Sequence, residues 1–162
     1  MLDAAKQAFY EIFRSKLHFL EAEWDFSQYE ASSEVSWIWH LVYVYDDIAL
    51  DFELNGREIA VDEMIWRWSV WSQRYAAGIR PLFLIGMFPE LAPRNNVEVG
   101  KMTKRINQLR RKALEIGEIS IIREWLLAEA DRYGFWLRTV GREEFVRRAA
   151  SGLGIEPPTT GG

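Results

Sequence analysis

The sequence contains no cysteine and only two histidines. The first absence excludes a disulfide framework, a thiolate zinc site, an iron–sulfur cluster and a cysteine nucleophile. Three glycine motifs are also missing: Gly-x-x-x-x-Gly-Lys-[Ser/Thr], Gly-x-Gly-x-x-Gly and Gly-x-Ser-x-Gly. Their absence argues against a phosphate-binding loop, a dinucleotide site and a serine-hydrolase elbow. We therefore expect no cofactor, and a non-catalytic protein rather than an enzyme.

Long apolar runs are absent as well. The most apolar stretch, residues 79–88, is short and contains Arg80 and Pro81, so it cannot span a bilayer. Charged residues interrupt the N-terminal segment 1–17, which therefore lacks the apolar region of a secretory signal. These absences predict a soluble, cytoplasmic protein that has no membrane partner.

The chain does contain the material for a core. It has 162 residues, of which 49% are apolar, and eight tryptophans. A chain of this length buries about 70% of the surface that its unfolded form exposes. We expect one domain over residues 1–152. Residues 153–162 are rich in glycine, proline and threonine, which predicts a flexible C-terminal tail.

Apolar residues recur at three- and four-residue spacing along most of the chain, which predicts helices. Candidate capping residues and glycines mark the helix ends. A long helix with heptad spacing begins at Asn95 or Asn96 and ends at Gly117. Asp62 is the predicted start of the helix before it, and Gly134 and Gly152 are the predicted ends of the last two helices. The predicted helices cover residues 2–24, 33–45, 62–77, 96–116, 119–133 and 142–151, with a short one between Pro81 and Pro89.

One segment also has strand character. VYVY is rich in β-formers, and LDFELNGREIAV resembles a hairpin around Asn55-Gly56. A two-residue turn there would pair Leu50 with Val61 and Phe52 with Ile59. The predicted fold class is therefore mainly α: a compact multi-helix domain, orthogonal or bundle-like, with one short β-hairpin around Asn55-Gly56.

The charges are unevenly distributed along the chain. Residues 1–63 contain 14 acids and four bases, whereas residues 94–112 contain seven bases and one acid. The two regions can neutralise one another inside the fold or between subunits packed head to tail, and opposite charges on separate faces suit repeated contacts between subunits. This polarity is the strongest global indication of function.

The bases of the long helix share one side of it, opposite the apolar stripe. Such a strip can contact phosphates, with further arginines at 94, 110, 142, 147 and 148. A nucleic-acid-associated protein is therefore one alternative. Its binding residues would be Lys101, Lys104, Arg105, Arg111 and Lys112.

The densest acidic cluster, residues 46–53, offers a second alternative. Carboxylates at four-residue spacing on a helix can share a divalent cation and position a phosphate. Asp47 and Asp51 would be the metal ligands of a phosphohydrolase-like enzyme. If the hairpin forms instead, Asp51 lines its solvent face.

The tryptophans favour a third hypothesis, which we prefer. Trp66 and Trp71 point to different sides of one predicted helix, and Trp39 lies on another. Aromatic side chains left outside the core are typical of protein interfaces. The hypothesis is a non-catalytic protein–protein interaction or assembly subunit of a larger complex or homo-oligomer, with Trp66, Trp71 and Trp39 as interface candidates.

Overall fold

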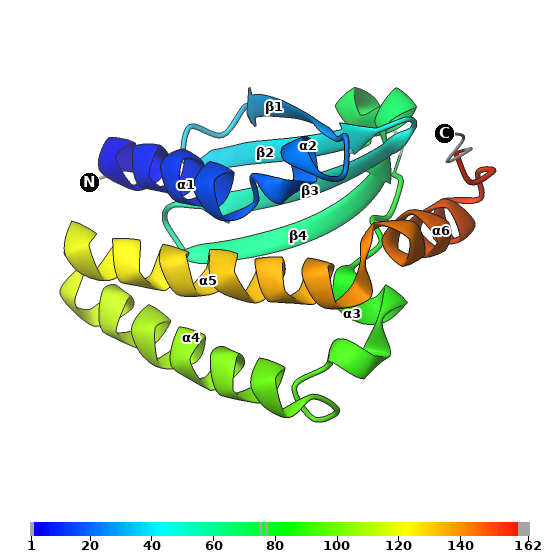
Figure 1. Ribbon diagram of the computed structural model, residues 1–162. Coiled ribbons are helices and arrows are strands. Elements are labelled where there is room, and N and C mark those ends of the chain that lie inside the picture. Colours follow the sequence, from blue (N-terminus) through cyan, green and yellow to red (C-terminus); the bar gives the residue numbers. More distant parts are fainter. Residues whose placement is uncertain (1, 75, 77, 159–162) are drawn as a thin grey trace.

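The computed structural model describes residues 2–74, 76 and 78–158. Along the chain, two helices are followed by four consecutive strands and then by helices only (Figure 1). The elements are α1 (Leu2–Lys16), α2 (Phe19–Ala22), β1 (Ser27–Ser32), β2 (Ile38–Tyr45), β3 (Ile48–Asn55), β4 (Ala60–Arg67), η1 (Trp68–Gln73), α3 (Leu84–Met87), η2 (Pro89–Leu91), α4 (Val97–Ile116), α5 (Ile119–Val140) and α6 (Arg142–Leu153).

The four strands form an antiparallel sheet in the order β1-β2-β3-β4. The helices α1 and α5 lie side by side across one face of this sheet, and α4 lies along the far side of α5 (Figure 1). The segment η1 covers part of the opposite face, where Trp68 and Trp71 pack against a second apolar cluster. The architecture is therefore a meander sheet with a helical layer on one side and a short 3-10 helix on the other.

Three aromatic rings join the layers. The Phe13 ring of α1 lies 5.7 Å from that of Phe52 on β3, which lies 5.2 Å from that of Tyr133 on α5. Each of the three side chains is at most 1% exposed. Offset and edge-on aromatic pairs of this kind add to the free energy gained by burying apolar surface. The core therefore lies where α1 and α5 meet the middle of the sheet.

The predicted fold class is wrong: the protein is a mixed α/β protein and not a mainly α one with a single hairpin. The predicted helix over residues 33–45 is mostly strand β2, and the one from Asp62 is strand β4 followed by η1. The physical reason is that strand β2, in the interior of the sheet, is covered on both faces. Every interior residue of β2 is buried, so its apolar residues do not alternate with polar ones.

The predicted hairpin exists, but its register differs. Leu50 pairs with Ile65, and Leu54 with Val61, because the β3–β4 loop is longer than two residues. Gly56 does not supply a positive φ to this loop; Ile59 does. Gly56 is needed for space, since an ideal Cβ there would lie 2.7 Å from the Trp39 ring.

Several predicted helix ends are confirmed and others are wrong. The Asn96 side chain accepts a hydrogen bond from the Val99 N–H at 3.1 Å, and Gly117 ends α4 with φ 70°. In contrast, α5 continues through Gly134 to Val140, and α6 continues through Gly152. The first predicted helix is also two helices, because the chain turns after Lys16.

The C-terminal part of the described chain is in contact with the core. Leu153 and Ile155 pack against the main apolar cluster, and the Ile155 N–H donates to the Ala150 carbonyl at 3.0 Å. Residues 159–162 of the predicted tail lie outside the described residues. Among the helices that the structure describes, none combines the length and the apolar character needed to cross a membrane.

Candidate functional site

The long helix α4 has two contrasting faces. Its inner face carries Val99, Ile106, Leu109 and Ala113, all of which are buried. This spacing is the predicted apolar stripe, although Ile116 at its end is 49% exposed. Since these buried residues fix the rotation of the helix about its axis, they also fix which side chains face solvent.

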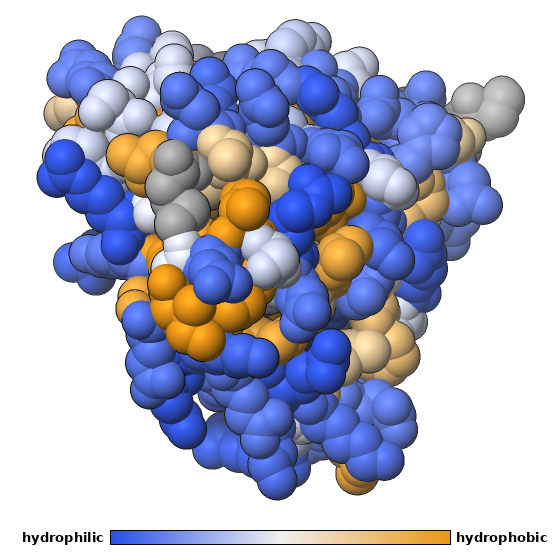
Figure 2. Space-filling view, turned by 90° about the vertical axis from the view of Figure 1, so that its left-hand side faces the viewer, coloured by the Kyte–Doolittle hydropathy of each residue, from blue (hydrophilic) through white to orange (hydrophobic). Residues whose placement is uncertain are grey.

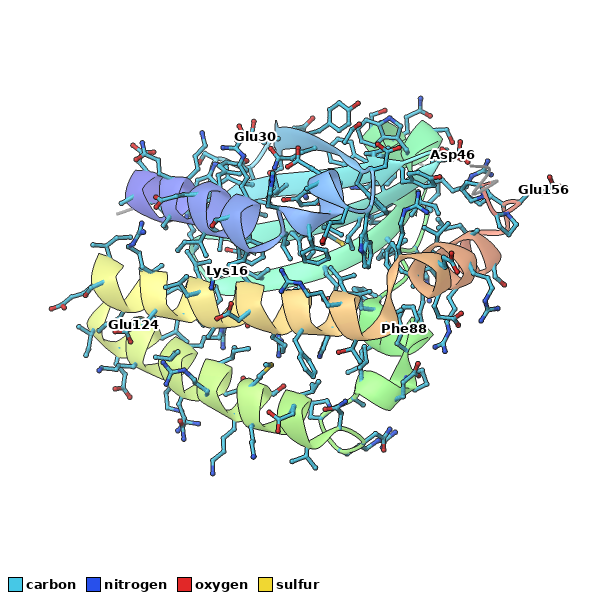
Figure 3. The ribbon with its side chains drawn as sticks, viewed as in Figure 1. Lys16, Glu30, Asp46, Phe88, Glu124 and Glu156 are labelled. Carbon is cyan, nitrogen blue, oxygen red and sulfur yellow. The ribbon has the colours of Figure 1, made fainter. Side chains whose placement is uncertain are left out.

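The outer face of α4 brings all five predicted basic residues together. We call this surface the basic strip; it comprises Lys101, Lys104, Arg105, Arg111 and Lys112, all exposed. At 1.5 Å per residue the strip is about 16 Å long. Nitrogen-tipped side chains project from this side of α4 into solvent (Figure 3).

Most of the basic strip lacks anionic partners within the chain. Lys101 lies 3.8 Å from Glu98, and both side chains are more than 60% exposed, so this ion pair contributes little. In the part of the chain that the structure describes, the remaining four cations have no carboxylate within ion-pair distance. The strip is therefore a positive surface available to a partner.

Cations elsewhere are largely engaged. Arg14 pairs with Glu30, and Arg123 lies 3.2 Å from Glu11. Arg148, predicted as an extension of the basic surface, instead bonds Glu144 and Glu90. Two further arginines predicted there are also engaged: Arg147 pairs with Glu144, and Arg142 donates to the Trp24 carbonyl. Arg110 donates to the carbonyls of Ile59 and Glu58, which fastens α4 to the β3–β4 loop.

Exposed apolar side chains lie at the end of the basic strip. Figure 2 looks at the end of the molecule where α1 and α5 begin and α4 ends, and it shows apolar residues gathered there. At this end Leu2 is 36% exposed, Leu114 50% and Ile116 49%. We call these three residues the apolar end; exposed apolar groups that gather on a surface are typical of an interaction site.

The tryptophans predicted as interface candidates lie elsewhere. Trp39 and Trp66 are 5% and 2% exposed, so their rings pack within this chain. Trp71 is half-buried and lies on the outer face of the sheet. The basic strip, whose residues were predicted to bind nucleic acid, is thus the predicted binding surface that the structure leaves exposed.

The two acidic candidates have separate partners. Asp47, in the two-residue β2–β3 turn, accepts hydrogen bonds from Arg67 and Ser69, and these lower its pKa against the opposing effect of partial burial. Asp51 is fully buried in β3 and accepts from His40 and Trp71. Among the described residues no group of three histidine or acidic side chains is arranged to hold a metal ion.

Sequence reasoning missed the buried network around Asp51. Its Oδ1 lies 2.8 Å from His40 Nδ1, and its Oδ2 accepts from Trp71 Nε1 at 3.1 Å. Arg74 approaches the other imidazole nitrogen at 3.4 Å. A histidine held by a carboxylate is an arrangement used in general-base catalysis, but His40 is 1% exposed and thus shielded from a substrate. The contacts instead fasten η1 to the sheet.

A second buried network lies between β4 and α5. The Tyr133 hydroxyl donates to Glu63 at 3.2 Å, and Glu63 also accepts from the Leu84 N–H. Glu129 accepts from Arg132 at 3.1 Å. Burial raises the pKa of Glu129 to about 7, against the lowering effect of Arg132, and burial also raises the pKa of Glu63. Sequence patterns placed Glu63 in the first turn of a helix and so gave no sign of this network.

Comparison of the chain with protein-family models, with curated proteins and with solved structures found no match.

Proposed function

We propose that this chain is a non-catalytic protein-interaction module that binds an acidic protein partner through α4. The observation that carries this proposal is that the basic strip runs along α4 and that two exposed residues of the apolar end, Leu114 and Ile116, follow it at the end of the same helix. Among the described residues no carboxylate pairs with four of these cations, so binding an acidic partner breaks no ion pair of theirs within the chain.

The composition of this surface favours a protein over a nucleic acid. Leu2, Leu114 and Ile116 give it an apolar component that phosphate recognition does not use. No aromatic residue lies on α4 to stack against a base. The net charge of −4 also opposes approach to a polyanion away from the strip.

The matching partner carries carboxylates spaced to meet Lys104, Arg105 and Arg111, beside an apolar group that covers the end of α4. Such charge complementarity mainly speeds association, and the apolar contact slows dissociation. A second copy of this chain is one source of an acidic surface, since residues 1–63 carry 14 acids and four bases.

The test is native mass spectrometry of the protein isolated from its own source at near-physiological salt. The double variant K104E/R111E is compared with the wild type, and R80E/R138E is the matched control. The control reverses two exposed arginines that lie away from α4. We expect a stoichiometric protein complex in the wild type and in the control, and its loss in K104E/R111E.

Two results would overturn the proposal. One is a complex that K104E/R111E leaves intact. The other is nucleic-acid binding by the basic strip in the absence of a protein complex. In that case duplex or single-stranded oligonucleotides bind the wild type with steep salt dependence, and K104E/R111E abolishes that binding.

A further inference from the structure

A cavity of about 260 Å³ lies at the end of the sheet opposite the apolar end. Residues from four segments line it: Trp66 and Arg67 of β4, Val70 of η1, Ile79, Arg80 and Leu82 of the chain that follows, and Gly152 and Leu153 of α6. Most of these side chains are apolar. The cavity therefore resembles a small-molecule site in having an apolar wall with few polar groups.

The walls are held by specific contacts. Leu82 exchanges two backbone hydrogen bonds with Ile65 of β4, at 2.8 and 3.0 Å, which fixes Leu82 at the edge of the sheet. On the opposite wall, Gly152 has no side chain; an ideal Cβ there would lie 2.6 Å from Leu82 Cδ1. Glycine at this position thus allows α6 to approach the segment closely.

The two arginines of the cavity differ in their surroundings. Arg67 is tied to Asp47, whose Oδ2 lies 2.9 Å from its Nε. Arg80 is exposed, and among the described residues no carboxylate pairs with it. One cation beside an apolar wall is complementary to an anion that has an apolar body, because a guanidinium binds a carboxylate through two parallel N–H donors.

The volume sets how much of a ligand the cavity can enclose. At about 30 Å³ per water, 260 Å³ corresponds to about nine water-sized atoms. That is a ligand of the size of a medium-chain carboxylate, and it is smaller than a nucleotide. The geometry points to this cavity as a binding site for a small monocarboxylate with an apolar body, whose carboxylate pairs with Arg80 and whose apolar part lies against Val70, Leu82 and Leu153. This inference is independent of the proposed function of α4.

The probe is octanoate, with 1-octanol as its uncharged counterpart. Isothermal titration calorimetry on the full chain measures both, at neutral pH. We expect octanoate to bind the wild type about tenfold more tightly than 1-octanol, since a hydrogen bond to a charged group contributes roughly this factor. The variant R80Q should bind the two compounds equally, whereas R94Q, which removes an exposed arginine in a distant loop, should behave as the wild type.

A second experiment fills the cavity with a larger side chain. V70W and L153W should each abolish binding of both compounds, and far-UV circular dichroism verifies that each variant is folded. K104E/R111E should retain octanoate binding, which separates this site from the basic strip. The inference is overturned if octanoate does not bind, if it binds no better than 1-octanol, if R80Q leaves the difference unchanged, or if both folded cavity-filling variants still bind octanoate.

Discussion

Replacing Glu129 by glutamine should change how stability depends on pH. Burial raises the pKa of this carboxyl to about 7, whereas in the unfolded chain it stays near its ordinary 4.5. The folded protein therefore favours the protonated form. The stability that the protonated Glu129 contributes is fully present below pH 4.5 and is lost as the pH rises through 7.

The expected size follows from the same two values. At about 1.4 kcal/mol for each pH unit, the interval between 4.5 and about 7 corresponds to a loss of about 3 kcal/mol between pH 4.5 and 8. Glu63, whose pKa burial also raises, acts in the same direction. E129Q keeps an oxygen that can accept from Arg132, and it has no charge to bury at any pH.

The assay is urea unfolding followed by tryptophan fluorescence at pH 5.5, 7 and 8. The informative quantity is the difference in free energy of unfolding between E129Q and the wild type, because groups common to both cancel. We expect E129Q to gain on the wild type by about 2 kcal/mol from pH 5.5 to pH 8. E124Q, an exposed change on the same helix, should show no such trend. A difference for E129Q that is constant across this range, or that falls, would refute the reasoning.

Two further changes test the sheet. G56V should lower the free energy of unfolding by about 1–3 kcal/mol, since its Cβ would meet the Trp39 ring. N55D keeps the oxygen that accepts two loop N–H groups and should lower the free energy of unfolding by about 0.5 kcal/mol or less. Equal effects of the two variants in chemical denaturation would contradict this account. D51A should lower the free energy of unfolding by about 3–5 kcal/mol because it leaves a buried imidazole and an indole N–H without their acceptor. D62A, an exposed change on the neighbouring strand, should lower it by about 0.5 kcal/mol or less. Similar unfolding midpoints for the two variants would argue against the buried network.

The features that could be predicted from the sequence are those specified by neighbouring residues. The beginning of α4 depends on Asn96, which caps the N–H three residues later, and its end depends on Gly117 in the left-handed region. The basic strip followed from the same local periodicity, because burying one stripe of a helix exposes the opposite one. All five of its residues are exposed as expected.

The sheet could not be predicted in this way because its burial is set by distant parts of the chain. The segment η1 and the helical layer bury β2 from both sides, which removes the alternation that marks a half-exposed strand. Asp62 looked like a helix cap but is an exposed strand residue. The pair Asp46-Asp47 between two apolar runs did carry a turn signal, since aspartate tolerates the positive φ that Asp46 adopts.

The buried networks depended on the same missing information. His40 and Asp51 come together only in the observed register of β2 and β3, where Asp51 faces Val42 and lies diagonal to His40. Glu63 meets Tyr133 across 70 positions of sequence. Spacing along the chain contains no trace of such contacts, so a reading of local patterns assigned these residues to solvent or to a helix end.

The packing of α1 against α5 has a consequence for synthesis of the chain. Phe13 on α1 emerges from the ribosome 120 residues before Tyr133, whose ring lies 6.4 Å from it in the folded protein. At roughly 5–20 residues per second, the apolar side of α1 waits about 6–24 s for the helix that covers it. The sheet strands, which pair with their immediate neighbours in sequence, can assemble during this interval. Newly made chains should therefore pass through a stage in which a finished sheet and a partly uncovered first helix are present together, and at that stage they are most exposed to aggregation and to chaperones.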